Sequence, residues 1–197
     1  MKRTILSDIE LITENEYLPA LLALLKKAKS SIDIMAFSFA IGSAGGKLSV
    51  NSAPYEIAET LVALKKKNKN LRIRLYIEGE RETSDRNAVT AAFLKKAGVK
   101  VKFGATHAKG FCIDNKTILF GSTNLTQQSI TKNNETNLLI RDPKMTEGFR
   151  EYFEHLWRGG RHGGIHLEPP YFADSDFKDL LLALIGAAQK TLEFSIY

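Results

Sequence analysis

Cysteine is almost absent from this sequence, and its scarcity limits the chemistry of the chain. Cys112 is the only cysteine among the 197 residues. No intrachain disulfide can therefore form, and a metal cage built of cysteines is excluded. A chain that does without disulfides is typical of a reducing compartment. We expect a cytoplasmic protein that is held together by its core.

Long apolar runs are also missing. The longest, such as Leu18–Leu25 and Leu180–Ile185, fall far short of the ~20 residues that a helix needs to cross a bilayer. The opening sequence MKRTILSDIELITENEY has acidic residues where a secretory signal would have its apolar core. The sequence therefore predicts a soluble protein of the cytoplasm, without stable membrane insertion.

What the chain does contain is enough apolar sequence for a core and an excess of positive charge. Hydrophobic residues make up 44% and charged residues 25%, which suits an ordinary globular domain and excludes disorder of the whole chain. The formal net charge is +6. Such a charge favours a polyanionic partner, either nucleic acid or an anionic membrane surface.

Helical and strand patterns alternate along most of the chain. The patterns predict helices over 17–29, 55–67, 84–96 and 143–157, and strands over 30–40, 71–79, 99–104, 107–114, 117–122 and 136–142. Strands that alternate with helices are typical of an α/β fold with a central sheet. The Gly- and Ser-rich segment Gly42–Pro54 is expected to be a loop, either the rim of a substrate cleft or a plain surface connection.

The C-terminus repeats the N-terminus at a fixed offset. A shift of 160 positions superimposes five identical pairs: Leu21/Leu181, Leu22/Leu182, Ala23/Ala183, Leu24/Leu184 and Ala28/Ala188. The strand that follows matches as well, with Asp33 aligned to Glu193. Self-similarity at a fixed period marks repeated structural units. We therefore expect one unit over residues 1–160, a linker over 161–175 and the start of a second, incomplete copy over 176–197.

Polar functional groups are densest between residues 106 and 137. His107 and Lys109 are two residues apart on one predicted strand, and Ser122 and Asn124 repeat that spacing on the next. Residues two apart project from the same face of a strand. One side of the sheet is then expected to present an imidazole, an ammonium group and two hydrogen-bond donors. Together these groups suit the binding of a phosphate.

The spacing of these residues resembles that of the phospholipase D superfamily. The pattern H-x-K-x₄-D-x₆-G-S-x-N is filled by His107, Lys109, Asp114, Gly121, Ser122 and Asn124, and the downstream acid is matched by Glu135. The resemblance covers residues 11–157. It implies a central mixed sheet with helices on both faces, and two such units paired about a pseudo-twofold axis. Members of the superfamily, which include bacterial endonucleases, phospholipases, cardiolipin synthases and tyrosyl-DNA phosphodiesterases, break or exchange phosphodiester bonds.

The resemblance also implies roles for the matching residues. The catalytic set is His107, Lys109, Ser122, Asn124 and Glu135. His107 is expected to attack phosphorus and form a phosphohistidine, with no metal or other cofactor. Glu135 is expected to accept a hydrogen bond from the other ring nitrogen of His107. Asp114 and Gly121 are expected to be structural, Asp114 because aspartate is common at turns for local reasons.

We expect a phosphodiesterase, and in particular an endonuclease that cleaves DNA or RNA. The alternative is a phospholipase D or transphosphatidylase acting on phospholipid, and the rival from another class is a non-catalytic nucleic-acid-binding module. One histidine cannot serve as nucleophile and general acid at the same time. A second motif is therefore expected from the partner chain of a homodimer or from sequence that follows this chain.

Other polar groups are weaker candidates. His162 and His166 have no acidic or cysteine partner at ligand spacing, so no metal site is predicted there. The run KKKNKN at 65–70 is expected to be a solvated helix end, although it offers cations to a phosphate.

Overall fold

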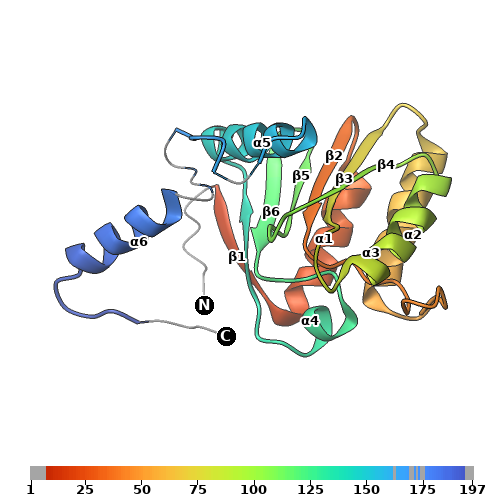
Figure 1. The fold of residues 1–197 in the computed structure, drawn as a ribbon, viewed down its shortest axis with the longest axis horizontal. Coiled ribbons are helices and arrows are strands. Elements are labelled where there is room, and N and C mark those ends of the chain that lie inside the picture. The colour runs from red at the N-terminus through yellow and green to blue at the C-terminus, as the bar shows by residue number, and fades with distance from the viewer. Residues whose placement is uncertain (1–7, 162, 169–170, 172, 174–175, 194–197) are drawn as a thin grey trace.

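The molecule, described by a computed structural model, is built around a single mixed sheet. The structure describes residues 8–161, 163–168, 171, 173 and 176–193. Across these residues seven strands lie in the order β1-β7-β6-β5-β2-β3-β4 (Figure 1). The strands are β1 Ile9–Thr13, β2 Ser31–Ala36, β3 Arg72–Glu78, β4 Lys100–Gly104, β5 Gly110–Ile113, β6 Thr117–Gly121 and β7 Thr136–Ile140. β2, β3 and β4 run parallel, and the other neighbours pair antiparallel.

Helices cover both faces of this sheet, which confirms the predicted fold class (Figure 1). They are α1 Tyr17–Lys27, α2 Ala53–Lys67, α3 Ser84–Lys96, α4 Gln127–Thr131, α5 Pro143–Trp157 and α6 Asp176–Ala187, with a 3₁₀ turn at Glu14–Glu16. One face of the sheet carries α1 to α4, and the opposite face carries α5. Pairing of two such units about a pseudo-twofold axis stays a prediction.

Two cores hold these layers together, one on each side of the sheet. Leu21 and Leu25 of α1 pack with Ile57 and Leu61 of α2 against one face. Phe149 and Phe153 of α5 pack on the other face. Five side chains of the sheet form the rest of this core: Met35, Tyr76, Cys112, Ile118 and Ile140. Every residue of β2 is buried, because a strand covered on both faces has no side that meets water.

Local chemistry sets the limits of the helices. α5 begins at Pro143, where a missing N–H costs nothing, and Asp142 caps it by accepting a hydrogen bond from the Met145 N–H at 2.8 Å. Ser52 caps α2 in the same way, with Pro54 in its first turn. The predicted helix 143–157 is confirmed to the residue. β1 and α4, which are five residues each, were not predicted.

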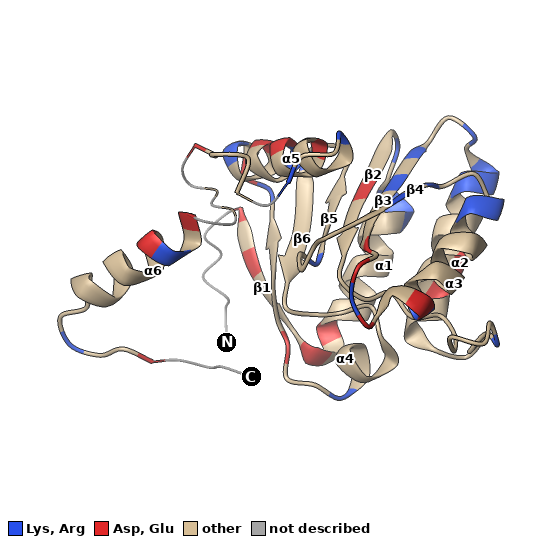
Figure 2. Cartoon of the chain, viewed as in Figure 1, with Lys and Arg blue, Asp and Glu red and all other residues tan. Residues whose placement is uncertain are grey.

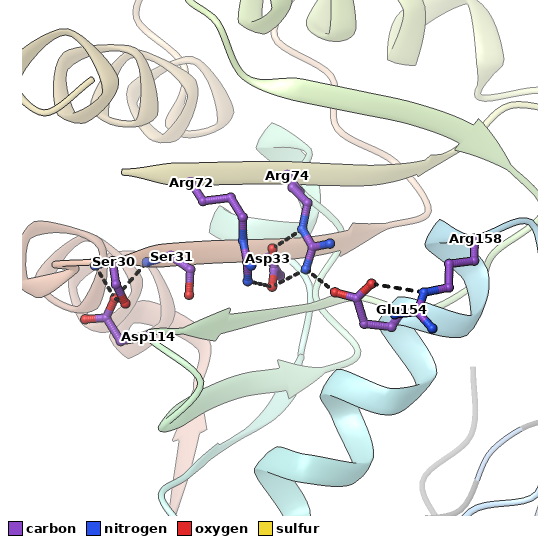
Figure 3. A network of polar contacts seen from close by, with 8 residues as sticks. All are labelled: Ser30, Ser31, Asp33, Arg72, Arg74, Asp114, Glu154 and Arg158. Carbon is purple, nitrogen blue, oxygen red and sulfur yellow. Dashed lines mark hydrogen bonds and ion pairs between the residues drawn. The ribbon is translucent and has the colours of Figure 1, made fainter. Parts of the chain in front are cut away.

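A buried ion network joins the sheet to α5 (Figure 3). On β3, Arg74 donates to both oxygens of Asp33 on β2, at 2.7 and 2.8 Å, and to Glu154 of α5 at 2.6 Å. Burial lowers the pKa of Arg74, but the hydrogen bonds to Asp33 and Glu154 raise it by more, so the guanidinium stays charged. The guanidinium also lies 4.7 Å from the centre of the Phe153 ring. Three elements are thus held by one cation.

α6 stands apart from the rest of the molecule (Figure 1). The predicted helix is present, and none of its side chains is buried. The internal repeat places Phe177, Leu181 and Ile185 at the positions of three buried residues of α1. Their exposures are 60%, 39% and 38%, against 4%, 0% and 0% for Tyr17, Leu21 and Leu25.

The strand expected after α6 is not formed at residues 191–193, and residues 194–197 lie outside the described part of the chain. The predicted unit boundaries therefore stay a prediction. Over the described ranges, no helix combines the length and the apolar character that crossing a membrane requires.

Candidate functional site

The candidate catalytic residues meet at one end of the sheet, in three loops. His107 and Lys109 precede β5, Ser122 and Asn124 follow β6, and Glu135 precedes β7. β5, β6 and β7 run antiparallel to their neighbours, so the start of β5, the end of β6 and the start of β7 lie at the same edge. The loops are tied together by bonds from the Gly121 N–H to the Lys109 carbonyl at 3.2 Å and from the Ser122 N–H to the Thr136 carbonyl at 3.1 Å.

The prediction that these side chains lie on strands was wrong, because side chains take up the backbone donors there. The Thr106 N–H donates to the carboxylate of Glu78 at 2.8 Å, and the Ala108 N–H donates to Thr106 Oγ1 at 3.2 Å. In the second loop, the Asn124 N–H donates to Ser129 Oγ at 2.9 Å. Donors used in this way do not extend the ladder, and the strands stop short of the site.

His107 lies between a cation and an aromatic ring. Lys109 Nζ is 3.3 Å from His107 Nδ1 and donates to the His107 carbonyl at 2.8 Å. The imidazole lies against Phe37 with 4.4 Å between ring centres. Burial lowers the pKa of His107, and the charges of Lys109 and Arg81 lower it further against the opposing charge of Glu78. The ring is therefore neutral near pH 7 and has a lone pair.

Lys109 supplies the cation of the site. Burial lowers its pKa to about 8, although the carboxylate of Glu135 acts in the opposite direction. The ammonium group is therefore mostly charged at neutral pH. Its amine also lies 5.2 Å from the centre of the Phe37 ring. A positive charge that is partly withdrawn from water interacts strongly with an anion.

Glu135 is bound by neighbouring polar side chains. Its carboxylate accepts hydrogen bonds from Ser122 Oγ at 2.5 Å, from Asn133 Nδ2 at 3.2 Å and from Ser129 Oγ. In the described chain its bonds go to these three groups and not to His107, contrary to expectation. The physical reason is that Lys109 occupies the ring nitrogen at which Glu135 was expected.

Ser122 and Asn124 lie near this carboxylate and differ in the hydrogen bonds that their side chains form with the protein. The Ser122 hydroxyl donates a hydrogen bond to Glu135 and accepts one from the Thr136 N–H at 3.0 Å. Asn124 Oδ1 is buried and has no hydrogen-bond partner among the described residues. Sequence reasoning missed Ser129, which bonds to both Asn124 and Glu135. Its signal was the helix start at Thr126, whose side chain accepts the Ser129 N–H.

Asp114 lies at the turn between β5 and β6, at the other end of β5 from His107 (Figure 3). Its carboxylate accepts the N–H groups of Lys29, Ser30 and Ser31 at 2.7–3.1 Å and the Ser30 hydroxyl at 2.9 Å. Burial raises the pKa of Asp114, but these backbone hydrogen bonds lower it by more, so it lies below its ordinary value. Asp114 thus fastens the β5–β6 hairpin to the start of β2.

Gly121 fills its position in the motif for a steric reason. A Cβ built there would lie 2.4 Å from the Thr136 carbonyl oxygen and 2.6 Å from Asn137 Cα. Contacts this short are not tolerated by backbone atoms, so a larger residue would push β6 and β7 apart next to the site. This geometry agrees with a structural role for Gly121.

The remaining polar candidates lie outside this site. His166 Nδ1 is 3.2 Å from an oxygen of Asp176, and His162 lies outside the described residues. Over the described ranges, no three His, Cys, Asp or Glu side chains gather as a metal-binding group. In the run 65–70, Lys65 Nζ donates to the carbonyls of Lys69 and Leu71, both at 2.7 Å. Figure 2 shows lysine and arginine gathered where α2 ends and along β4.

Solved structures define the class of the fold. Nuc from Salmonella typhimurium, described as a phospholipase D family member, superposes with a TM-score of 0.64 at 25% identity, covering 78% of this chain and 95% of Nuc. Phosphatidylserine synthase from Haemophilus influenzae superposes at 0.59 and 16% identity over 75% of this chain and 36% of that one. The fold is that of the phospholipase D superfamily.

Sequence comparison gives the family. Residues 21–157 match the family described as cardiolipin synthase, PLD-like domain, and the chain belongs to that family of phospholipase D-like proteins. Mitochondrial cardiolipin hydrolase of Chlamydomonas reinhardtii is 31% identical over 100 residues, which are 49% of this chain and 44% of the relative. The mouse protein of the same name is 35% identical over 75 residues, 36% of this chain and 34% of the relative. These matches span less than half of the curated relatives.

Proposed function

We propose that the chain is a phosphodiesterase whose substrate is DNA or RNA. The observation that supports this most directly is the pair of a neutral imidazole and a partly buried ammonium group, His107 and Lys109, 3.3 Å apart at a loop edge. A nucleophile beside a cation is the arrangement that attack on a phosphodiester requires. The family of the chain supports the same chemistry.

In the first chemical step, a ring nitrogen of His107 forms a bond to phosphorus while the bond to the leaving oxygen breaks. An ammonium group can only donate, so Lys109 donates to Nδ1 and the hydrogen of the neutral ring lies on Nε2. A bound phosphate competes for the ammonium group of Lys109. Once Lys109 turns to a phosphate oxygen, the ring hydrogen can move to Nδ1 and leave a lone pair on Nε2.

The leaving oxygen must gain a proton, and the phosphohistidine must then be hydrolysed. A second histidine does both: it protonates the leaving group and later takes a proton from the water that attacks phosphorus and breaks the P–N bond. His107 is the nucleophile, so the second histidine comes from a second motif. It is supplied by a second copy of this chain or by sequence that follows it.

Charge and similarity favour nucleic acid as the substrate. The net charge of +6 attracts a polymer of phosphates over a long range, and Nuc is matched over nearly its whole length. The second candidate is a phospholipid, which is favoured by the names of the curated relatives, the mitochondrial cardiolipin hydrolases. The complete set His107, Lys109, Ser122, Asn124 and Glu135 argues against a module that only binds.

The test is to incubate the protein with plasmid, single-stranded DNA, RNA and cardiolipin vesicles, each with and without EDTA. We expect cleavage of at least one nucleic acid, unaffected by EDTA, and its loss in His107→Ala with an unchanged circular dichroism spectrum. His166→Ala, at a histidine that lies outside the site, is the matched control and should retain full activity. Full turnover by His107→Ala would contradict the mechanism, and cleavage of cardiolipin alone would favour the second candidate.

A further inference from the structure

A third group shares the aromatic ring that carries His107 and Lys109. Phe37 follows directly after β2 and is half-buried. The guanidinium carbon of Arg81, in the loop between β3 and α3, lies 5.9 Å from the centre of the Phe37 ring. The imidazole of His107 and the amine of Lys109 lie 4.4 and 5.2 Å from the same ring. Arg81 therefore belongs to the edge of the site, although the sequence pattern did not single it out.

The fold makes no evident use of the Arg81 charge. Arg81 is exposed, and among the described residues it forms no ion pair within 4.0 Å. Burial raises the pKa of Tyr76, and the negative charge of the preceding Glu80 raises it further. An exposed arginine that lies over a half-buried aromatic ring, and forms no ion pair within the described part of the chain, has five donors available to a ligand.

One buried carboxylate fixes the Arg81 loop relative to the His107 loop. Glu78 is fully buried. One of its oxygens accepts the Glu80 N–H at 2.7 Å and the other accepts the Thr106 N–H at 2.8 Å. Glu80 directly precedes Arg81, and Thr106 directly precedes His107. Glu78 therefore fixes the backbone segments that carry Arg81 and His107 relative to one another.

The same loop is also held against Phe37. The Asn87 amide donates to the Phe37 carbonyl at 2.9 Å, and Thr83 Oγ1 donates to it at 3.3 Å. The side-chain oxygen Oδ1 of Asn87 accepts the Phe39 N–H at 2.9 Å. The start of α3 and the segment that carries the aromatic ring thus form one rigid piece. A preorganised cation binds an anion with less loss of entropy than a mobile one.

We propose that Arg81 binds a second phosphate of the substrate, next to the one that His107 attacks. This proposal rests on the proposed function. Lys109 is in contact with the imidazole, whereas Arg81 is linked to the imidazole through the Phe37 ring that both groups approach. Lys109 can therefore contact the phosphate that is attacked, and Arg81 a neighbouring phosphate of the same substrate. The planar guanidinium donates two parallel hydrogen bonds to a phosphate, which a lysine cannot do. The substrate chemistry is then a string of at least two phosphodiesters.

The electrostatics of the site agree with this placement. The positive charge of Arg81 helps to lower the pKa of His107, after burial and Lys109. The guanidinium is therefore close enough to affect the nucleophile without touching it. A bound second phosphate would neutralise this charge and make the imidazole more basic, so the two events are coupled.

The experiment compares Arg81→Gln with Arg150→Gln. Arg150 lies on α5, which covers the opposite face of the sheet from α3, and its replacement removes the same charge. Cleavage of a thymidylate oligonucleotide, of cardiolipin vesicles and of bis(p-nitrophenyl) phosphate is measured with each variant. The first two substrates carry more than one phosphodiester and the third carries a single one, so the three arms separate the source of the second phosphate.

We expect Arg81→Gln to lower kcat/KM about tenfold on the substrate that supplies the second phosphate, mainly through KM, because one charge-assisted contact is lost. On bis(p-nitrophenyl) phosphate and in Arg150→Gln the change should stay within about twofold. Arg81→Lys should recover part of the loss. Equal losses on single and multiple phosphodiesters would overturn the proposal, as would no loss on any substrate.

A binding measurement keeps this proposal separate from the proposed function. Fluorescence anisotropy of the labelled oligonucleotide needs no cleavage. Arg81→Gln should weaken its binding about tenfold and reduce the slope of log K against log salt by about one. If the protein cleaves nothing but shows this loss, the proposed function fails and Arg81 remains a phosphate contact. Unchanged binding and unchanged salt slope would overturn the proposal for nucleic acid.

Discussion

Replacement of Asp114 tests most clearly whether a residue of the motif has a chemical or a structural role. Its carboxylate accepts three backbone N–H groups and one hydroxyl at the junction of α1 and β2. The turn at Asp114 and Asn115 has φ values of 53° and 56°, and the Lys116 N–H bonds to the Ile113 carbonyl at 3.0 Å. Asp114 and Asn115 are the central pair of the turn that this bond closes, and their left-handed conformation is one that asparagine and aspartate tolerate.

The magnitude of the effect follows from these contacts. Hydrogen bonds to a charged group are worth roughly 1.5–3 kcal/mol each when buried, but water replaces part of them at this half-exposed site. We expect Asp114→Ala to lower the free energy of unfolding by about 2–4 kcal/mol, part of which is the cost of a left-handed alanine. Asp114→Asn keeps one acceptor oxygen and tolerates the backbone, so about 1–2 kcal/mol is expected.

The dependence on pH has a definite sign. The pKa of Asp114 is lowered in the folded state, so its contribution is present above the ordinary aspartate value of ~4 and is lost as pH falls through the folded pKa. Urea denaturation followed by circular dichroism at pH 7 and in acid measures both effects. The gap between wild type and Asp114→Asn should narrow in acid. An Asp114→Ala protein of unchanged stability and no activity would refute the structural role.

Two further predictions concern cations. The pKa of Lys109 is lowered by burial to about 8, so kcat/KM should fall as pH rises above about 8, where the ammonium group loses its proton. Lys109→Arg should remove this fall at high pH, because arginine stays charged. If the fall persists in Lys109→Arg, Lys109 is not the group that titrates. Arg74→Ala should lower the free energy of unfolding by about 3–5 kcal/mol in urea, because it removes the buried cation that Asp33 and Glu154 share and leaves them only the more exposed Arg72 and Arg158. Arg72→Ala removes a side chain that is 44% exposed and should cost less than about 1 kcal/mol.

Most of the fold could be predicted from periodicity and capping. α5 begins and ends where its proline, cap and apolar spacing place it, and β5 and β6 form the expected hairpin around Asp114. β1 was missed because its five residues pair with β7 across more than 120 positions of sequence, a contact that no local pattern records. α4 is a five-residue helix between two loops, too short for periodicity to show.

The site could be predicted as a set of residues but not as a geometry. His107 and Lys109 have the alternation of a strand, yet the Thr106 N–H is taken by Glu78, which lies 28 positions earlier in the chain. The sequence around Ser129 indicates only a helix start at Thr126, and Arg81 carries no signal of spacing. The relation of both residues to the site exists only after the loops fold together. The expected hydrogen bond between Glu135 and His107 was wrong for the same reason, because Lys109 contacts the imidazole instead.

The dependence of the site loops on side-chain hydrogen bonds has an evolutionary consequence. Because Glu78, Thr106 and Ser129 bond to the backbone of the loops, the ladder of the sheet does not rely on the residues between the strand ends. Mutation can therefore change the surroundings of the catalytic groups without loss of the scaffold. A few loop substitutions can thus change the substrate while the same sheet is kept, and Arg81 is one such loop position.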